Sequence, residues 1–560
     1  MNIHSNFLKK EINAQVLEFE KILSKKAVSL LLESDIIVGK YTGINNGKFI
    51  VECSSQYVPR KGEHYQLFLL PYTYGEFSCW GDRGLTYSDL LKNSTAISSG
   101  KCLWVQKKKE ETDIRCGVSQ VETSFQEKLH ENTLVFFGPK EPPIQYLQNL
   151  KQYSESTRGQ SCELLSLKKN NQWDPELISD NNLRPDFFIN QLNLEDTLVL
   201  QGPPGTGKTT LIGKIISDLL KKKKSVLVTS MTNNALMEIA TQKSIEEFVL
   251  DNKVLKSNLS TDELNELDNL NTLTDLTPMD GYLHLSTFHN TSRYIDAYPR
   301  YDYVIIDEAS QAFSTTLSAF QNLGHKNLWV GDHMQLSPIV LLNKDRIKEI
   351  DALPIVNGFE SVCENNIYPG FMLEKTRRFG DRGARYTSVF YQGKLKSAFE
   401  KKYDTTRLPK VINLAGGPIS INAIMKNDDK SPLDGFYKVK QIIDAISDKI
   451  PSNDILIITP FNKTVKSLKK YLVENNININ VETIDRVQGK TVEVAILLLC
   501  NSSYFFSLKQ KRFNVSTSRS RLNTFIVHDE NIFSELSNNS LVGKYLNMMK
   551  NENLKLIGDN

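Results

Sequence analysis

Long apolar runs are missing from this sequence. No stretch reaches the roughly 20 residues that a membrane-spanning helix needs. Residues 1–26 alternate apolar and charged side chains and lack the continuous apolar core of a signal peptide. We therefore expect a soluble, cytoplasmic protein that makes no contact with membranes.

Cysteine pairs at metal-binding spacing are also missing. The sequence has 7 cysteines but no CxxC pair, and their spacing fits neither a zinc site nor an iron–sulfur cluster. Free thiols in a reducing compartment are the expected state.

The sequence has little excess of either charge. Its 68 Lys and Arg nearly balance 65 Asp and Glu, which leaves a net charge of +3. Overall charge therefore does not indicate a polyanion partner, and any nucleic-acid surface must be local. At 560 residues the chain exceeds one compact core, so several domains are expected.

The N-terminal part of the chain differs in pattern from the rest. Apolar residues at helical spacing predict an amphipathic helix within residues 1–35. Short β-rich runs broken by turn residues then predict a small barrel or sandwich at 36–137, and a helical connector follows at 138–195. The buried side of the first helix should carry Phe7, Leu8, Ile12, Val16, Phe19, Ile22 and Leu23.

From Asp196 onward strand, turn and helix alternate, which predicts an α/β fold of doubly wound type. A mostly helical segment separates two sets of strands, so we predict two lobes in tandem, at 196–380 and 381–550. The first should contain a small helical insertion at 244–280, and residues 551–560 should form a polar tail. The expected strands are 196–201, 225–230, 282–287, 301–307 and 327–332, then 410–415, 454–460, 480–484, 493–500 and 523–528.

The segment GPPGTGKT at 202–209 follows an apolar strand and opens a helix. This context identifies a P-loop, in which backbone N–H groups hold the β-phosphate of a nucleotide and Lys208 bridges the β- and γ-phosphates. Thr209 is the expected hydroxyl ligand of Mg²⁺. The residues expected to contact the nucleotide here are Gly202, Pro203, Pro204, Gly205, Thr206, Gly207, Lys208, Thr209 and Thr210.

The segment YDYVIIDEASQ at 301–311 supplies adjacent carboxylates at the end of an apolar strand. Open α/β sheets bind their ligands at this edge. Asp307 is expected to hold Mg²⁺, and Glu308 is expected to polarise the attacking water.

These motifs together resemble superfamily 1 helicases. DEASQ, GDHMQLSP at 331–338, DRVQGKT at 485–491 and NVSTSRSR at 514–521 occur in the family's order, and the match is closest to subgroup B and the helicase of nonsense-mediated RNA decay. The resemblance implies two RecA-like lobes with ATP between them and single-stranded DNA or RNA across both. It also implies an accessory barrel on a helical stalk before the P-loop, a monomeric motor, 5′ to 3′ movement, and a protein partner for the barrel.

Site residues follow from the same resemblance. Gln335 would sense the γ-phosphate, Arg378 and Arg519 would contact it from the second lobe, and Gly489 would lie at the nucleotide. Arg377 stands where the family commonly has a tyrosine that stacks on adenine, and the segment before the P-loop lacks a matching adenine-reading glutamine. No such role is implied for Arg521 or Arg512, and simple surface exposure is expected for Arg512. The implied nucleic-acid contacts are Thr232, Asn233, Thr287, Thr459, Pro460 and Thr483.

The predicted function is ATP-dependent unwinding or translocation on single-stranded nucleic acid. One alternative is a motor that displaces proteins without separating strands. Another is an ATP-gated recognition module with little turnover, which the presence of Lys208, Asp307, Glu308, Gln335 and Arg519 argues against. The small polar residues of the nucleic-acid set also fit ordinary turn and capping roles.

Overall fold

A computed structural model of the chain describes residues 2–45, 47–54, 58–74, 78–107, 113–160, 164, 173–179, 184–400, 409, 411–426 and 429–558. Parts of the predicted connector, at 161–163, 165–172 and 180–183, lie outside these ranges. The chain forms two compact units: unit 1 holds residues 1–5, 149–340 and 345–560, and unit 2 holds 6–148 and 341–344. Within the described ranges, no helix combines the length and apolar character that crossing a bilayer requires.

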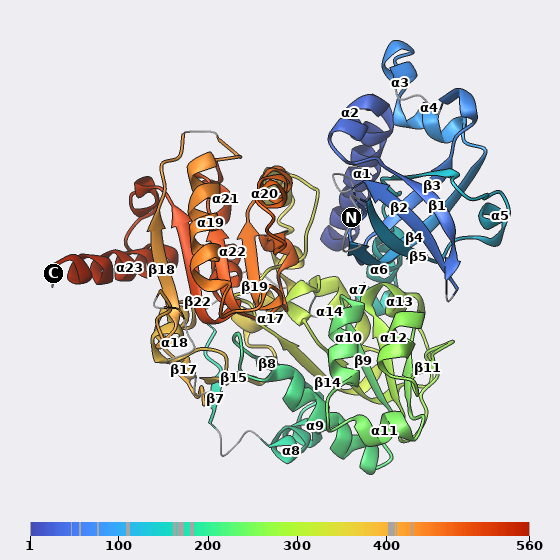
Figure 1. The fold of residues 1–560 in the computed structure, drawn as a ribbon. Helices are drawn as coiled ribbons and strands as arrows, with labels where there is room; N and C mark the ends of the chain where they lie inside the picture. The colour runs from blue at the N-terminus through green and yellow to red at the C-terminus, as the bar shows by residue number, and fades with distance from the viewer. Residues whose placement is uncertain are drawn as a thin grey trace. The chain divides into compact units, whose positions relative to one another are not determined.

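Unit 2 contains six strands that close into an antiparallel barrel in the order β1-β2-β5-β4-β3-β6 (Figure 1). Strand β5 was not predicted from the sequence, because DIRCGVS has no apolar stretch. Its Gly117 is needed for packing, since a Cβ there would lie 2.3 Å from the Trp104 Nε1 atom. The strands are β1 (Ile37–Asn45), β2 (Lys48–Ser54), β3 (His64–Leu69), β4 (Ala96–Lys107), β5 (Asp113–Ser119) and β6 (Leu134–Gly138).

The N-terminal helix is two helices, α1 (Ile3–Ser24) and α2 (Ala27–Leu32). Phe7 and Leu8 are fully buried, as expected. The buried side of α1 also carries a carboxylate, Glu11, which the apolar pattern did not indicate. Glu11 accepts the backbone N–H groups of Leu341 and Leu342, each at 2.9 Å, and these bonds offset the cost of burying its charge.

Lobe 1 of unit 1 is built on a nine-stranded sheet in the order β11-β10-β12-β9-β13-β14-β8-β15-β7. The five predicted strands are present as β8, β9, β12, β13 and β14, and neighbouring strands run parallel. Helices α8 (Pro185–Leu194), α9 (Lys208–Lys221) and α10 (Asn233–Ala240) lie beside them. The strands are β7 (Glu176–Ile178), β8 (Thr197–Gln201), β9 (Val226–Ser230), β10 (Val254–Lys256), β11 (Asn271–Thr272), β12 (Leu283–Thr287), β13 (Tyr301–Ile306), β14 (Gly324–Gly331) and β15 (Gly370–Leu373).

Two predictions about lobe 1 were wrong. The insertion at 244–280 is not purely helical: besides α11 (Glu246–Leu250) and α12 (Thr261–Glu266) it holds β10 and β11, which extend the sheet beyond β12. These strands are too short for a pattern of their own, and pairing with β12 stabilises them. The lobe also begins before residue 196, because β7 pairs with β15.

Lobe 2 is a five-stranded parallel sheet in the order β18-β22-β21-β19-β20. The first strand was predicted at 410–415 but lies at 417–422, because Val411 and Leu414 are 45% and 46% exposed and cannot be core-facing strand residues. The strands are β18 (Gly417–Asn422), β19 (Ile455–Thr459), β20 (Asn480–Thr483), β21 (Val492–Leu498) and β22 (Ser520–His528).

Residues 551–558 of the C-terminal tail predicted at 551–560 continue helix α23 (Leu541–Gly558), and 559–560 lie outside the described residues. Glu552 anchors this part of the helix, because its carboxylate accepts hydrogen bonds from Arg382 and Arg385 of lobe 2. The polar composition of residues 551–558 therefore did not prevent helix formation.

Candidate functional site

The P-loop connects β8 to α9. Gly205 and Gly207 have φ values of +75° and +85°, which favour glycine because a side chain would be strained there. The Lys208 ammonium group donates a hydrogen bond to the Gly202 carbonyl at 2.5 Å, and the Thr206 hydroxyl donates one to the Pro203 carbonyl at 2.8 Å. A loop of this shape at a helix N-terminus can hold phosphate groups.

Carboxylates gather close to the P-loop. Asp307 follows β13 directly and is 4% exposed, and burial together with neighbouring Glu308 raises its pKa. Glu308 has a φ of +54°, a left-handed backbone that is rare outside glycine and typical of functional sites. Glu238 of α10 accepts a long hydrogen bond of 3.4 Å from the Thr209 hydroxyl. Burial and Glu308 raise the pKa of Glu238 as well.

The Thr209 hydroxyl and the Asp307 carboxylate fit the preference of Mg²⁺ for hard oxygen ligands. Glu238 was missed by the sequence analysis. Its position follows from the packing of α10 beside α9, and no local motif marks it.

Gln335 belongs to a buried hydrogen-bond network centred on Asp332. The Asp332 carboxylate accepts hydrogen bonds from the Gln335 amide at 2.8 Å, the Tyr391 hydroxyl at 2.7 Å and the Gln201 amide at 3.3 Å. Asn514 of lobe 2 donates to the Tyr391 hydroxyl at 2.9 Å. The network therefore joins the strand before the P-loop to the helix that precedes Arg519.

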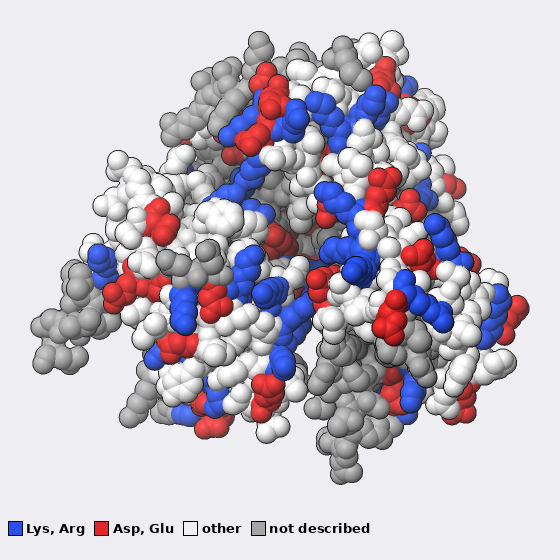
Figure 2. All heavy atoms as spheres, turned by 90° about the horizontal axis from the view of Figure 1, so that it is seen from above, with Lys and Arg blue, Asp and Glu red and all other residues white. Residues whose placement is uncertain are grey.

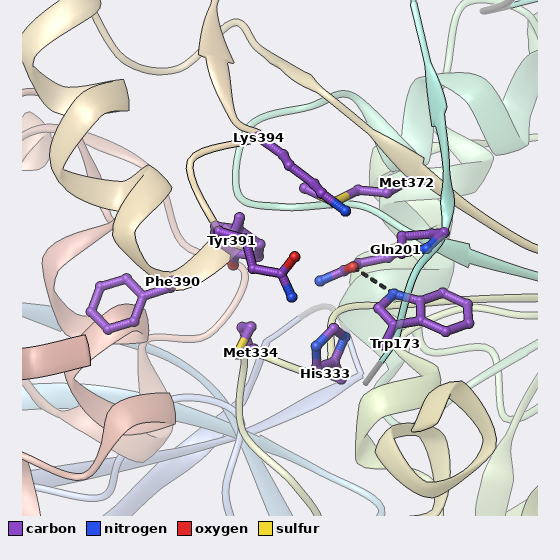
Figure 3. Close-up of a pocket in the computed structure, with 10 residues that line it drawn as sticks. Trp173, Gln201, His333, Met334, Met372, Phe390, Tyr391 and Lys394 are labelled. Carbon is purple, nitrogen blue, oxygen red and sulfur yellow. Dashed lines mark hydrogen bonds between the residues drawn. The ribbon is translucent and has the colours of Figure 1, made fainter. Parts of the chain in front are cut away.

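A small cavity of about 20 Å³ borders this network, which is room for one buried water. In Figure 3 the Trp173 indole N–H donates to the Gln201 side-chain oxygen at 3.0 Å. His333 also lines the cavity, and its Nδ1 atom is buried without a hydrogen-bond partner among the described residues. The cavity is too small for a nucleotide and was not expected from the sequence.

The segment that carries Arg377 and Arg378 lies along the P-loop. The Thr376 hydroxyl donates to the Pro204 carbonyl at 2.9 Å, and the Arg377 backbone N–H donates to the Gly205 carbonyl at 2.8 Å. The Arg378 guanidinium donates to the Ser518 carbonyl at 2.7 Å, so it contacts the residue before Arg519. These bonds place Arg378 between the P-loop and lobe 2.

Arg519 is buried in lobe 2. Its guanidinium donates to the Val515 carbonyl at 2.7 Å and to the Ser518 hydroxyl at 3.0 Å. Burial lowers the pKa of Arg519 to about 10, and burial and the charge of Arg519 lower that of Arg378 to about 9. Both side chains therefore keep their charge at neutral pH.

Lobe 2 also reaches the carboxylates of lobe 1. The Gln488 amide donates to the Glu308 carboxylate at 3.0 Å. Its neighbour Gly489, which has a φ of +83°, was predicted as a site residue, but Gln488 itself was not. The position of Gln488 in the DRVQGKT motif was the sequence signal that could have identified it.

The predicted nucleic-acid residues lie at the carboxyl ends of parallel strands. Ser230 pairs with Thr287 across β9 and β12, and Thr459 pairs with Thr483 across β19 and β20. Thr232 and Thr287 are also N-caps, accepting hydrogen bonds from the backbone N–H groups of Ala235 and Asn290. Each pair of strands therefore ends with polar residues at one edge of its lobe.

Thr459 and Pro460 are buried. The Thr459 hydroxyl has no hydrogen-bond partner among the described residues. The structure thus places these two residues below the surface of that edge, whereas Thr232 is exposed.

Asn233 is held by a residue of the insertion. The fully buried Lys256 ammonium group donates to the Asn233 side-chain oxygen at 2.9 Å and forms a salt bridge with Glu263 at 3.0 Å. Lys256 was not predicted as a site residue, because its contact with Asn233 joins segments that are far apart along the chain. The insertion therefore supports one of the predicted nucleic-acid residues.

We expect Lys256→Met to lower the free energy of unfolding by about 3 kcal/mol, since removing one partner leaves Glu263 as a poorly solvated, unpaired charge. Affinity for single strands should fall as well, because Asn233 loses its donor. Urea denaturation followed by circular dichroism measures the first effect. Lys253→Met is the matched control: its pair with Asp251 is exposed, so a loss of stability equal to that of Lys256→Met would contradict the role of the buried pair.

Comparisons with known proteins agree with the motifs. AAA-domain family models match residues 188–340 and 358–531. An uncharacterized ATP-dependent helicase of Methanocaldococcus jannaschii is 27% identical over 256 residues, covering 42% of this chain and 37% of the relative. The DNA polymerase alpha-associated DNA helicase A of Schizosaccharomyces pombe is 24% identical over 414 residues, covering 60% of this chain and 62% of the relative.

A third relative, the DNA replication ATP-dependent helicase/nuclease DNA2 of Saccharomyces cerevisiae, is 22% identical and covers 65% of this chain but 26% of the relative. The chain thus spans less than two thirds of the length of each of these proteins. The solved structure of Arterivirus nonstructural protein 10, a helicase, matches with a TM-score of 0.39 and 11% identity over 85% of this chain and 80% of that one.

The chain belongs to the superfamily 1 helicases, in the group of the nonsense-mediated-decay helicase. The resemblance drawn from the motifs is thereby confirmed.

Proposed function

We propose that this protein hydrolyses ATP to move along single-stranded nucleic acid, as a helicase or translocase. The observation that carries the proposal is the meeting of both lobes at the P-loop. Arg378 bonds to Ser518, and Gln488 of lobe 2 bonds to Glu308 of lobe 1. A site assembled from both lobes changes when the lobes move, which is what converts a chemical cycle into motion.

In lobe 1, Lys208 and the backbone N–H groups of the P-loop hold the phosphates. Thr209 and Asp307 would hold Mg²⁺, which neutralises phosphate charge and orients the terminal phosphate when bound. Glu308 accepts the proton of the attacking water. Gln488 positions the Glu308 carboxylate, because its amide donates to one carboxylate oxygen and leaves the other free to accept the proton.

Arg378, which lies between the P-loop and lobe 2, and Arg519 of lobe 2 stabilise the negative charge that develops on the phosphate oxygens. Both now donate to protein oxygens of residues 515–518, so closure of the lobes exchanges these acceptors for phosphate oxygens. Gln335 couples the phosphates to lobe 2, since the Asp332 network connects it to Tyr391 and Asn514. Hydrolysis reverses the exchange and reopens the lobes.

The nucleic-acid strand crosses the carboxyl edges of both sheets. Thr232, Asn233 and Thr287 in lobe 1 and Thr483 in lobe 2 supply small polar contacts to the backbone. The buried Thr459 and Pro460 shape this edge from below. Names of the curated relatives favour DNA, and the family implies 5′ to 3′ movement. The cytoplasmic location, the monomeric state and a protein partner for the barrel stay predictions.

The first test compares the rate of ATP hydrolysis with and without single-stranded DNA and RNA. A second set of substrates, duplexes with a 5′ or a 3′ single-stranded overhang, tests the direction of movement. We expect stimulation by one nucleic acid of at least about tenfold, and no hydrolysis by Lys208→Ala, which loses its phosphate contact. Comparing duplex separation with translocation distinguishes a helicase from a motor that only displaces proteins. A rate that no single strand stimulates would overturn the proposal.

A further inference from the structure

Two stacked aromatic rings on lobe 2 each contact a cation. The Lys430 ammonium group lies 5.0 Å from the Phe461 ring centroid, and Phe461 stacks on Phe506 with centroids 6.0 Å apart and an interplanar angle of 29°. The Arg512 guanidinium in turn lies 3.9 Å from the Phe506 ring centroid. We call Lys430, Phe461, Phe506 and Arg512 the ring stack.

The ring stack joins four separate segments. Phe461 follows β19 at its carboxyl end, Phe506 lies on the short helix α21 (Tyr504–Ser507), and Arg512 lies on α22 (Gln510–Thr517). Arg512 also forms a salt bridge with Asp485 at 3.2 Å. Arg512 was expected to be simply exposed, but its side chain is 24% exposed and holds a fixed position over a ring.

Helix α21 presents a further ring to solvent. Phe505 is 75% exposed, although it is next to the packed Phe506. The helix is held in place by Tyr504, whose buried hydroxyl donates to the Asp529 carboxylate at 2.8 Å. Burial and Asp529 raise the pKa of Tyr504, so it remains a neutral donor. Phe505 is therefore an exposed aromatic side chain on a fixed base.

We propose that Phe505, the chain neighbour of Phe506 in the ring stack, is a stacking platform for the bases of single-stranded nucleic acid. The proposal rests on the proposed function and adds a binding site to it. Aromatic faces bind bases of any sequence, and flanking cations attract the phosphates. Lys430 and Arg512 each place such a cation against one of the two packed rings.

The position of the stack favours a nucleic acid over another partner. Phe461 lies two residues after Thr459, so the rings lie at the carboxyl edge where β19 and β20 end together. On the face shown in Figure 2, Lys and Arg are interspersed with Asp and Glu. A strand crossing such a mixed surface needs contacts that do not depend on charge, and base stacking supplies them.

The test measures the affinity of Phe505→Ala for fluorescein-labelled oligonucleotides by anisotropy at one fixed salt concentration. We expect the dissociation constant for oligo-dT to rise by about tenfold. An abasic strand of equal length should bind the wild-type protein and Phe505→Ala equally, because it has no bases to stack. Val473→Ala is the control, since this exposed residue lies at the far end of α20 (Asn462–Glu474), toward the opposite edge of the sheet.

A second variant gives a positive signal. In Phe505→Trp, indole fluorescence should be quenched by oligo-dT and not by the abasic strand. Because Phe505 is exposed, neither change should affect folding, and basal ATP hydrolysis checks this. If the wild-type protein binds oligo-dT and Phe505→Ala binds it with the same affinity, the stacking role of Phe505 is overturned but the proposed function is not. Failure of the wild-type protein to bind any single strand would overturn the proposed function as well.

Discussion

Glu308→Gln should bind ATP with nearly normal affinity and lose about 10³-fold of its hydrolysis rate. The amide has almost the same shape but cannot accept the proton of the attacking water. Glu308 is well placed for this task, because its unusual backbone conformation and the Gln488 amide fix its carboxylate beside Asp307. Fluorescent nucleotide titration measures binding, and single-turnover phosphate release measures hydrolysis.

Glu238→Gln is the matched control for this experiment. Glu238 is also a carboxylate with a raised pKa near Thr209, but it belongs to α10 and not to the end of β13. We expect this variant to keep most of its activity. If Glu238→Gln abolished hydrolysis and Glu308→Gln did not, the role of general base would pass to Glu238.

Arg519→Ala should lose at least about 10³-fold of nucleic-acid-stimulated ATP hydrolysis, while affinity for single strands stays within about twofold. Its charge stabilises the transition state only when the lobes close, so ATP binding to the open protein should change little. Arg519→Lys keeps the charge but loses the planar fork of donors, and it should restore only a small part of the rate.

Arg519 is buried and donates to backbone carbonyls, so its loss could also disturb lobe 2. Circular dichroism and strand affinity separate this effect from catalysis. Arg521→Ala is the control, because Arg521 forms a partly exposed salt bridge with Glu493 at 3.0 Å and should leave hydrolysis nearly unchanged. Normal hydrolysis by Arg519→Ala with weakened strand binding would show that Arg519 binds the polyanion instead.

Much of the fold could be predicted where strands are long and apolar. The strands β8, β9, β12, β13 and β14 each carry a buried run, and a buried parallel strand has no polar side to obscure its pattern. The short strands β7, β10 and β11 were missed for the opposite reason. Their two or three residues carry no periodic signal, and only pairing with a neighbour makes them strands.

The candidate site divides in the same way. Lys208, Asp307, Glu308 and Arg519 could be selected because each lies in a local motif. Glu238, Lys256 and Tyr391 could not, because their contacts join segments that are distant along the chain. The ring stack combines four such segments, and none of them forms a recognisable motif by itself.

The sequence alone therefore determined the family, the P-loop, the carboxylates after β13 and the arginine of the second lobe. These features are local, since each needs a fixed order of residue types at one strand end or helix start. The tertiary structure alone decided which side chains face Glu308, what holds Asn233, and which aromatic ring remains exposed beside the ring stack. Such features depend on packing between distant segments. Each contact is set by the core that surrounds the two side chains and not by the residues next to them in the sequence.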